Sequence, residues 1–154
     1  MRLFVSSSFI YAIEICGTST HPLFILSIIR VVKKTIRLEE HYSFQDWDSL
    51  LVALPNKHPT IWIINDEEVL TKIKDDNAKK SSFLEAFPQI DKNSFFWKSS
   101  EQMCSLIRQN HWHFWVDKIQ KSECLVLDIQ LGNSALDALE QNWNQSIKTN
   151  HQHL

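Results

Sequence analysis

The stretch TIWIIN (Thr60–Asn65) is a nearly continuous apolar run that follows Pro59. A short run of this kind is typical of a β-strand that is buried on both faces. A helical pattern precedes this run and ends at Pro55. Its apolar residues recur at the spacing of one helix face, and they are Trp47, Leu50, Leu51 and Leu54. Ser43, with Asp46 three residues later, resembles a capping box and predicts the start of this helix. The sequence here therefore predicts a helix that leads into a buried strand.

Three extended stretches precede this helix. They read FIYAIEIC (Phe9–Cys16), PLFILSIIRVV (Pro22–Val32) and TIRLEEHYSF (Thr35–Phe44), and each is rich in strand-forming residues. The turns between them are short, so neighbouring strands are expected to be antiparallel. A helix between the third and fourth strands permits a right-handed crossover, which places the fourth strand parallel in the same sheet.

The rest of the chain alternates shorter strands and helices. We expect a strand over Glu67–Lys74, a helical turn over Ser81–Phe87, a hairpin around Ser99 and Ser100, a helix over His111–Lys121, a strand over Glu123–Gly132 and a last short helix over Ser134–Trp143.

This order of elements resembles the first lobe of actin-like ATPases, and specifically the actin-like cytoplasmic components of type II secretion and type IV pilus machinery, of the GspL and PilM type. The stretches that carry the resemblance are FIYAIEIC (9–16), TIWIINDEEVLTKIK (60–74), FLEAFPQIDKNSFFW (83–97) and MCSLIRQNHWHFWVDKIQKSECLVLDIQLGN (103–133). The resemblance implies an α/β fold in which a ribonuclease-H-like mixed sheet occupies residues 1–66. It also implies a small inserted α/β subdomain over 67–132, of the kind that contacts neighbouring proteins, and a short helix with a polar tail over 133–154.

The chain departs from that family where a nucleotide would bind. Actin-like ATPases grip phosphate with glycine-containing hairpins, since glycine lets the backbone approach phosphate closely. This chain has two glycines, Gly17 and Gly132, and no Asp-x-Gly near its first hairpin. We therefore expect no cofactor and no nucleotide turnover by this chain alone.

Charge and cysteine content narrow the class of partner. The formal net charge is −2 over 154 residues and the lysines are scattered among acids, so nucleic acid is not an expected partner. Three cysteines without close spacing argue against a disulfide framework and favour a reduced compartment, so we expect a cytoplasmic protein. The apolar run Leu23–Val32 is interrupted by Arg30 and is too short to span a bilayer, so direct membrane insertion is not expected.

Carboxylates offer a catalytic alternative. A ribonuclease-H-like sheet can hold two metal ions between acidic side chains. Glu14 on the first strand, Asp66 after the fourth strand and Asp46 near the helix stand in suggestive places. The simpler interpretation is that Glu14 faces solvent and Asp66 caps a turn.

His111 and His113 diverge on a helix, which disfavours joint metal binding.

Six tryptophans are many for a chain of this length. Trp62 and Trp115 fit core positions. Trp97, Trp112 and Trp143 are candidates for contacts with a partner, because tryptophan is enriched at the centres of protein interfaces. The leading hypothesis is therefore a non-catalytic protein-binding or assembly module that uses an edge strand and exposed aromatic residues of the 67–132 subdomain, either toward protein partners or in self-association. The alternatives are a metal-dependent nuclease or hydrolase, and a sensor that binds a small ligand or nucleotide beyond the strand ends.

Overall fold

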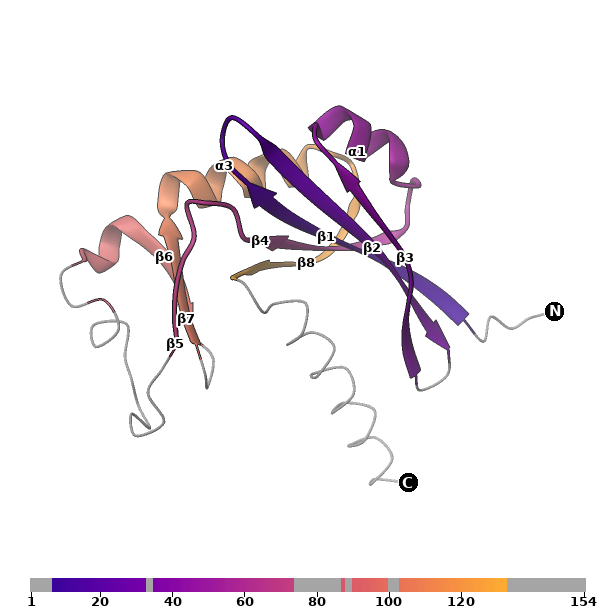
Figure 1. Ribbon diagram of the computed structural model, residues 1–154, viewed down its shortest axis with the longest axis horizontal. Coiled ribbons are helices and arrows are strands. Elements are labelled where there is room, and N and C mark those ends of the chain that lie inside the picture. The colour runs from indigo at the N-terminus through magenta and orange to yellow at the C-terminus, as the bar shows by residue number, and fades with distance from the viewer. Residues whose placement is uncertain (1–6, 33–34, 74–86, 88–89, 100–102, 133–154) are drawn as a thin grey trace, which may run out of the picture.

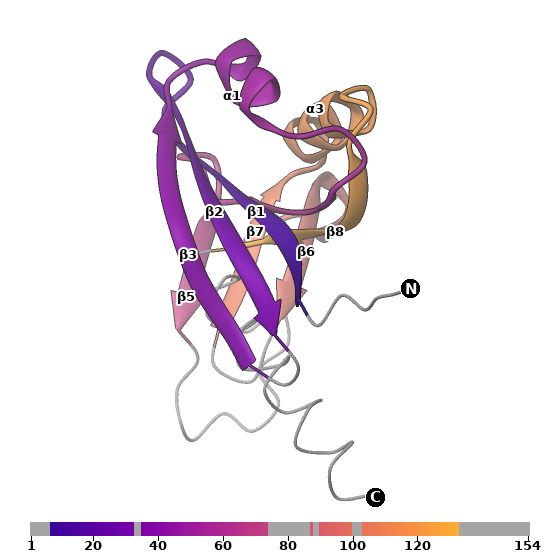
Figure 2. The same ribbon diagram turned by 90° about the vertical axis from the view of Figure 1, so that its right-hand side faces the viewer.

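Two β-sheets and two α-helices make up the part of the chain that the structure describes. The structure is a computed structural model that describes residues 7–32, 35–73, 87, 90–99 and 103–132. The larger sheet has five strands in the order β3-β2-β1-β4-β8, and the smaller sheet has three in the order β5-β7-β6. Helices α1 and α3 lie on the same side of the larger sheet, which Figure 1 and the perpendicular view in Figure 2 both show.

The larger sheet is mixed, as the sequence predicts. Its strands are β1 (Ser7–Gly17), β2 (Pro22–Val32), β3 (Thr35–Phe44), β4 (Pro59–Ile64) and β8 (Leu125–Leu131). The first three pair antiparallel, and β4 runs parallel to β1. The predicted order of three strands, a helix and a parallel fourth strand is therefore confirmed. The chain has a mixed α/β fold, and the finer ribonuclease-H-like assignment stays a prediction.

Helix α1 (Trp47–Ala53) begins later than the predicted capping box would place it. Its N-cap is Asp46, whose carboxylate accepts hydrogen bonds from the backbone N–H and the hydroxyl of Ser49, both at 2.8 Å. The predicted cap at Ser43 is wrong, because Ser43 still belongs to β3 and pairs with Ile25. Both residues are good caps, and the length of β3 decides between them.

The smaller sheet follows the predicted hairpin. Strands β6 (Phe95–Ser99) and β7 (Met103–Arg108) pair antiparallel, and β5 (Leu70–Ile73) joins the other side of β7. A single 3₁₀ turn, η1 (Lys92–Ser94), leads into β6, and α3 (Gln109–Gln120) follows β7.

Strand β8 corrects one part of the predicted organisation. The range 67–132 assigns it to the smaller subdomain, but β8 is hydrogen-bonded in parallel to β4 of the larger sheet. Its alternating pattern predicts a strand and carries no information about which sheet the strand joins. The predicted helical turn over Ser81–Phe87, apart from Phe87, and the predicted helix over Ser134–Trp143 lie outside the described residues.

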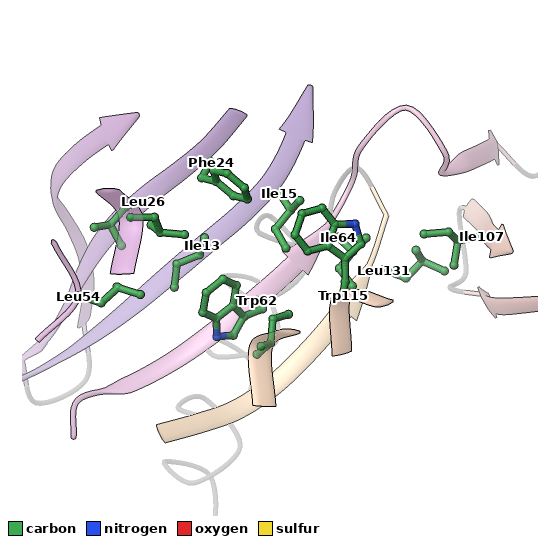
Figure 3. Packing of buried hydrophobic residues seen from close by; sticks show 12 residues of the cluster. Ile13, Ile15, Phe24, Leu26, Leu54, Trp62, Ile64, Ile107, Trp115 and Leu131 are labelled. Atoms are coloured by element: carbon green, nitrogen blue, oxygen red, sulfur yellow. The ribbon is translucent and has the colours of Figure 1, made fainter. Parts of the chain in front are cut away.

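The main core lies between the larger sheet and the two helices (Figure 3). Ile13 and Trp62 are fully buried in its centre, and Trp115 reaches it from α3 with 7% of its surface exposed. The predicted core positions of Trp62 and Trp115 are confirmed. Burial of an aliphatic or aromatic side chain of this size stabilises a fold by about 1.5–3 kcal/mol. The core therefore fixes α1 and α3 relative to the strand ends beneath them.

The two sheets meet at Gly132, which has a φ of +111°. Its N–H donates to the carbonyl of Ile64 at 3.0 Å, and a Cβ at this position would lie 2.5 Å from Oγ of Ser105 on β7. Glycine is required here by both the backbone conformation and the close approach. The end of the larger sheet therefore contacts the smaller sheet directly.

Candidate functional site

A cleft of about 530 Å³ opens where β1 and β4 end. Its floor is the β1–β2 turn and the segment after β4, and its walls come from the first turn of α1 and the exposed side of α3. The carboxyl ends of parallel strands are the usual place for a binding site in an open α/β sheet. The position agrees with the pocket that the sequence predicts beyond the strand ends.

The β1–β2 turn is tied to the segment that follows β4. Gly17 has a φ of +85°, and a Cβ there would lie 2.4 Å from the carbonyl oxygen of His21. The N–H of Ser19 donates to Oε1 of Glu67 at 2.9 Å, and the N–H of Glu67 donates to the carbonyl of Gly17 at 3.1 Å. These two bonds hold the floor of the cleft together although its halves are about fifty residues apart.

Asp66 connects the end of β4 to α3. Its Oδ2 lies 2.6 Å from Nε2 of His111 and 3.0 Å from Nε1 of Trp115, and its Oδ1 accepts from the N–H of Glu68 at 3.1 Å. Nε1 of Trp115 also lies within hydrogen-bonding distance of Nε2 of His111, at 3.1 Å, so the three side chains form one hydrogen-bonded cluster. The Asp66 side chain is 9% exposed, and both of its oxygens are occupied. Asp66 therefore holds α3 over the cleft.

The structure brings two of the three predicted carboxylates to the cleft. Asp46 and Asp66 both line it. Glu14 points to the opposite face of β1 from Ile13 and Ile15, because side chains alternate along a strand, and it accepts from Nδ2 of Asn65 at 3.1 Å. Within the described ranges, no group of three or more His, Cys, Asp and Glu side chains is placed to hold a metal ion.

Cys16 also lines the cleft, at the end of β1. Burial first, and then the nearby carboxylates of Glu14 and Asp66, raise the pKa of its thiol to about 11. The thiolate, not the thiol, is the nucleophilic form of cysteine. Cys16 is therefore protonated at neutral pH and is poorly suited to covalent catalysis.

Aromatic rings form the wall of the cleft on the side of the helices. Trp47 of α1 packs against Trp115 of α3 with ring centroids 6.1 Å apart, and Phe114 meets Trp115 edge to face at 5.1 Å. The ammonium of Lys118 lies over all three rings, at 4.9 Å from Trp47, 5.5 Å from Phe114 and 5.7 Å from Trp115. Sequence analysis missed Trp47 and Lys118 as site residues. The spacing of Phe114 and Lys118 on one helix face was the available signal.

The predicted partner-binding tryptophans lie outside this cleft. Trp112 stacks on Phe96 of β6, with centroids 4.0 Å apart and planes 12° apart. Trp97 packs against the small cluster of Phe87 and Cys104. Trp112 and Trp97 are both half-buried, and Trp143 lies outside the described residues. Their role toward partners stays a prediction.

The histidines diverge on α3 as expected. His111 turns toward Asp66, whereas His113, two residues later, is exposed.

Comparisons with known proteins find a likeness in structure and none in sequence. No family model matches the chain, and no curated protein matches its sequence. Among solved structures, the chain is similar to the cytoplasmic domain of EpsL, an inner membrane component of the type II secretion system of Vibrio cholerae, with a TM-score of 0.49 and 8% identity over 78% of this chain. The match covers 57% of that domain, so the chain spans little more than half of its length. At this identity and TM-score the likeness assigns no family, and the resemblance to actin-like components stays a prediction. The described part of the chain contains no helix with the length and apolar character needed to cross a bilayer.

Proposed function

We propose that this chain is a non-catalytic protein-binding module that holds a segment of a partner protein in the groove between α1 and α3. The groove consists of the cleft of about 530 Å³ and a more open cavity of about 300 Å³ beside it. The two cavities share Trp47, Phe114 and Lys118, so they lie next to each other along α3. A groove made of two adjacent cavities suits an extended or helical peptide segment. The shared lining of the two cavities is the observation that carries the proposal.

The lining supports a binding role. Phe114 is 52% exposed although it is a large apolar side chain, and exposed aromatic residues beside a groove are typical of protein interfaces. The groups that chemistry would need are occupied in other ways. Asp66 is bonded to α3, Asp46 caps α1, and Cys16 stays protonated at neutral pH.

The groove is a better binding surface than the outer strands of the larger sheet, one of which, β8, lies within the range 67–132 where the sequence suggests an edge strand. The pairing of β3 shifts opposite Ile28 and Ile29, which leaves Glu39 as an extra residue, and the pairing of β8 shifts in the same way around Leu127. Bulges at sheet edges interrupt the row of free hydrogen-bonding groups that a partner strand would need. Both edges of the larger sheet are therefore poorly suited to strand addition.

Site-specific photo-crosslinking in the native host tests the proposal. A photoreactive residue placed at Phe114 or at the exposed Lys121 lies in the groove, and one at Leu38 of β3 lies on the sheet face opposite the helices. We expect an adduct of one defined mass from both groove positions and none of that mass from Leu38. A mass of twice this chain would identify self-association through the groove. Absence of adducts from the groove, or the same adducts from all three positions, would refute the proposal.

A small-ligand sensor is the second candidate, because a cleft of about 530 Å³ falls within the usual range for small-molecule sites. Thermal unfolding with ATP, GTP and Mg²⁺ at millimolar concentrations tests this candidate. A ligand that binds the folded state raises the melting temperature by mass action. No shift with any of them would count against a nucleotide. The nuclease alternative has no comparable support, because Asp66 lines the cleft whereas Glu14 does not line it and accepts from Asn65.

A further inference from the structure

We infer that the groove recognises a positively charged side chain, a lysine or arginine of the partner segment, and that Lys118 occupies this position while the partner is absent. The inference rests on the proposed function and names the chemistry of the partner. The occupant is a basic segment of another protein.

The cage around Lys118 is the first observation. Its ammonium lies within 6 Å of the centroids of three rings, those of Trp47, Phe114 and Trp115. Ring faces carry negative potential and attract cations, and arrangements of several rings are used to bind alkylammonium groups. The groove therefore already holds one cation in the geometry that a ligand cation would adopt.

Lys118 can leave this cage without breaking an ion pair. Among the described residues no carboxylate is paired with Lys118, while the adjacent Asp117 is paired with Lys121 at 2.8 Å. A lysine side chain is long and flexible, so its charged end can move into solvent. Replacement of its ammonium by a partner's cation keeps the cation–π contacts and adds no unpaired charge to the cage.

The surrounding charge favours a cation over an anion. Four carboxylates line the same cleft, namely those of Asp46, Asp66, Glu67 and Glu68, against the side chains of Lys118 and His111. Glu68 is exposed, and its carboxylate has no hydrogen bond or ion pair to another described residue. Acidic groups around an aromatic cage attract basic ligands and repel acidic ones. Charge complementarity therefore selects a basic segment.

Peptide titration monitored by NMR tests the inference. The probes are acetyl-Gly-Arg-Gly-amide and the same peptide with citrulline, which keeps the shape of arginine and lacks its charge. The readout is the indole N–H signals of Trp47 and Trp115 in protein labelled with ¹⁵N. We expect the arginine peptide to shift both signals and the citrulline peptide to bind at least about tenfold more weakly, because the cation–π and carboxylate contacts need the charge. Equal shifts with both peptides, or none with either, would overturn the inference.

Two variants identify the cage. Phe114→Leu keeps an apolar side chain at a half-exposed position, and loss of one ring should weaken arginine binding by about two- to fivefold. Lys118→Met keeps the length of the side chain without its charge, so it should bind the arginine peptide more tightly than the native protein. Phe9→Leu, near the start of β1 and outside the cleft, removes another exposed ring that lies near a cation and should leave binding unchanged. Weaker arginine binding by Lys118→Met, together with native-protein binding of acetyl-Gly-Glu-Gly-amide, would indicate an anion site instead.

The two experiments separate the inference from the proposed function. Crosslinks from the groove, together with no preference for the arginine peptide, would refute recognition of a cation. The proposed protein-binding role would still be supported. Arginine binding without any groove crosslink would retain the cation site and refute the proposed protein partner.

Discussion

Asp66 shows how one side chain positions the groove. It follows β4 and is hydrogen-bonded to both His111 and Trp115, so it joins the sheet to the helix that carries most of the aromatic cage. The sequence marks Asp66 as a candidate carboxylate after the fourth strand, but its bonds to α3 could not be read from the run Asp66–Glu68. His111 and Trp115 are more than forty residues away along the chain, and only the fold brings them to Asp66.

Removal of that acceptor should weaken the fold. Asp66→Ala removes the hydrogen bonds that join the end of β4 to His111 and Trp115 and leaves Nε1 of Trp115 with His111 alone, and each hydrogen bond lost costs about 0.5–1.5 kcal/mol. We expect a loss of that order in the free energy of unfolding, measured by urea denaturation. Asp128→Ala provides the control, since Asp128 is exposed and bonds only within β8. Equal losses in both variants would contradict the role assigned to Asp66.

The thiol of Cys16 gives a second prediction at this scale. With a pKa of about 11 against an ordinary value of 9.0, its thiolate fraction at pH 8 should be about a hundredfold lower than in the unfolded chain. Alkylation by iodoacetamide, followed by peptide mass spectrometry, should therefore be slow in the native state and rise with a midpoint near pH 11. A midpoint near 9 in the native protein would show that burial and the carboxylates do not act on this thiol.

The same pKa links Cys16 to stability at alkaline pH. The folded state retains a proton that the unfolded chain releases near pH 9, so the contribution of this group is complete below pH 9. It is lost as the pH rises through about 11. Cys16→Ser should reduce the slope of unfolding free energy against pH between these two values.

At the scale of elements, α1 depends on its N-terminal cap. Hydrogen bonds from the backbone N–H and then the hydroxyl of Ser49 lower the pKa of Asp46 below its usual value. A lowered carboxyl pKa means that the cap stabilises the folded state above the ordinary pKa of 3.8 and is lost as the pH falls through the lower folded value. Asp46→Ala should therefore destabilise α1 at pH 7 and have little effect at the acid end of the titration.

Hydrogen exchange of the amides in α1 measures this effect. Asp48→Ala is the matched control, because Asp48 lies in the first turn but does not accept the capping hydrogen bond. Faster exchange of the Leu50 amide in the Asp46 variant alone is expected. Equal acceleration in both variants would show that the charge near the helix terminus, and not the cap, stabilises α1.

Local pattern predicted most of the elements and little of the site. The apolar run of β4, the β6–β7 hairpin and the helical spacing in α3 are all visible within short windows of sequence, since strand and helix periodicities are local properties. The groove is formed by α1 and α3, whose cage residues Trp47 and Lys118 are far apart in sequence. The groove forms because α1 and α3 pack on the same sheet, and residue spacing within either helix does not predict that packing.

At the scale of the whole molecule, the two sheets share one core. Ile107 of β7 is fully buried and belongs to the same cluster as Ile13 and Trp62 of the larger sheet. Trp112 of α3 stacks on Phe96 of β6, which fixes the helix against the smaller sheet as well. Because β8 returns to the larger sheet after α3, the chain crosses between the sheets twice. The smaller sheet is therefore expected to depend on the larger one for its stability.

This dependence predicts a single unfolding transition. Amide exchange in β7 of the smaller sheet should report the same free energy as exchange in β4, because neither sheet retains its buried face when the other opens. Gly132→Ala should make the free energies reported by amide exchange in β4 and in β7 differ. A Cβ there overlaps Oγ of Ser105 and forces a positive φ on alanine, so it should cost more than about 1 kcal/mol and lower the protection of β7 more than that of β4. Two separate transitions in the native protein would instead support an independent subdomain within residues 67–132, and the junction at Gly132 would then be only a contact between folded units.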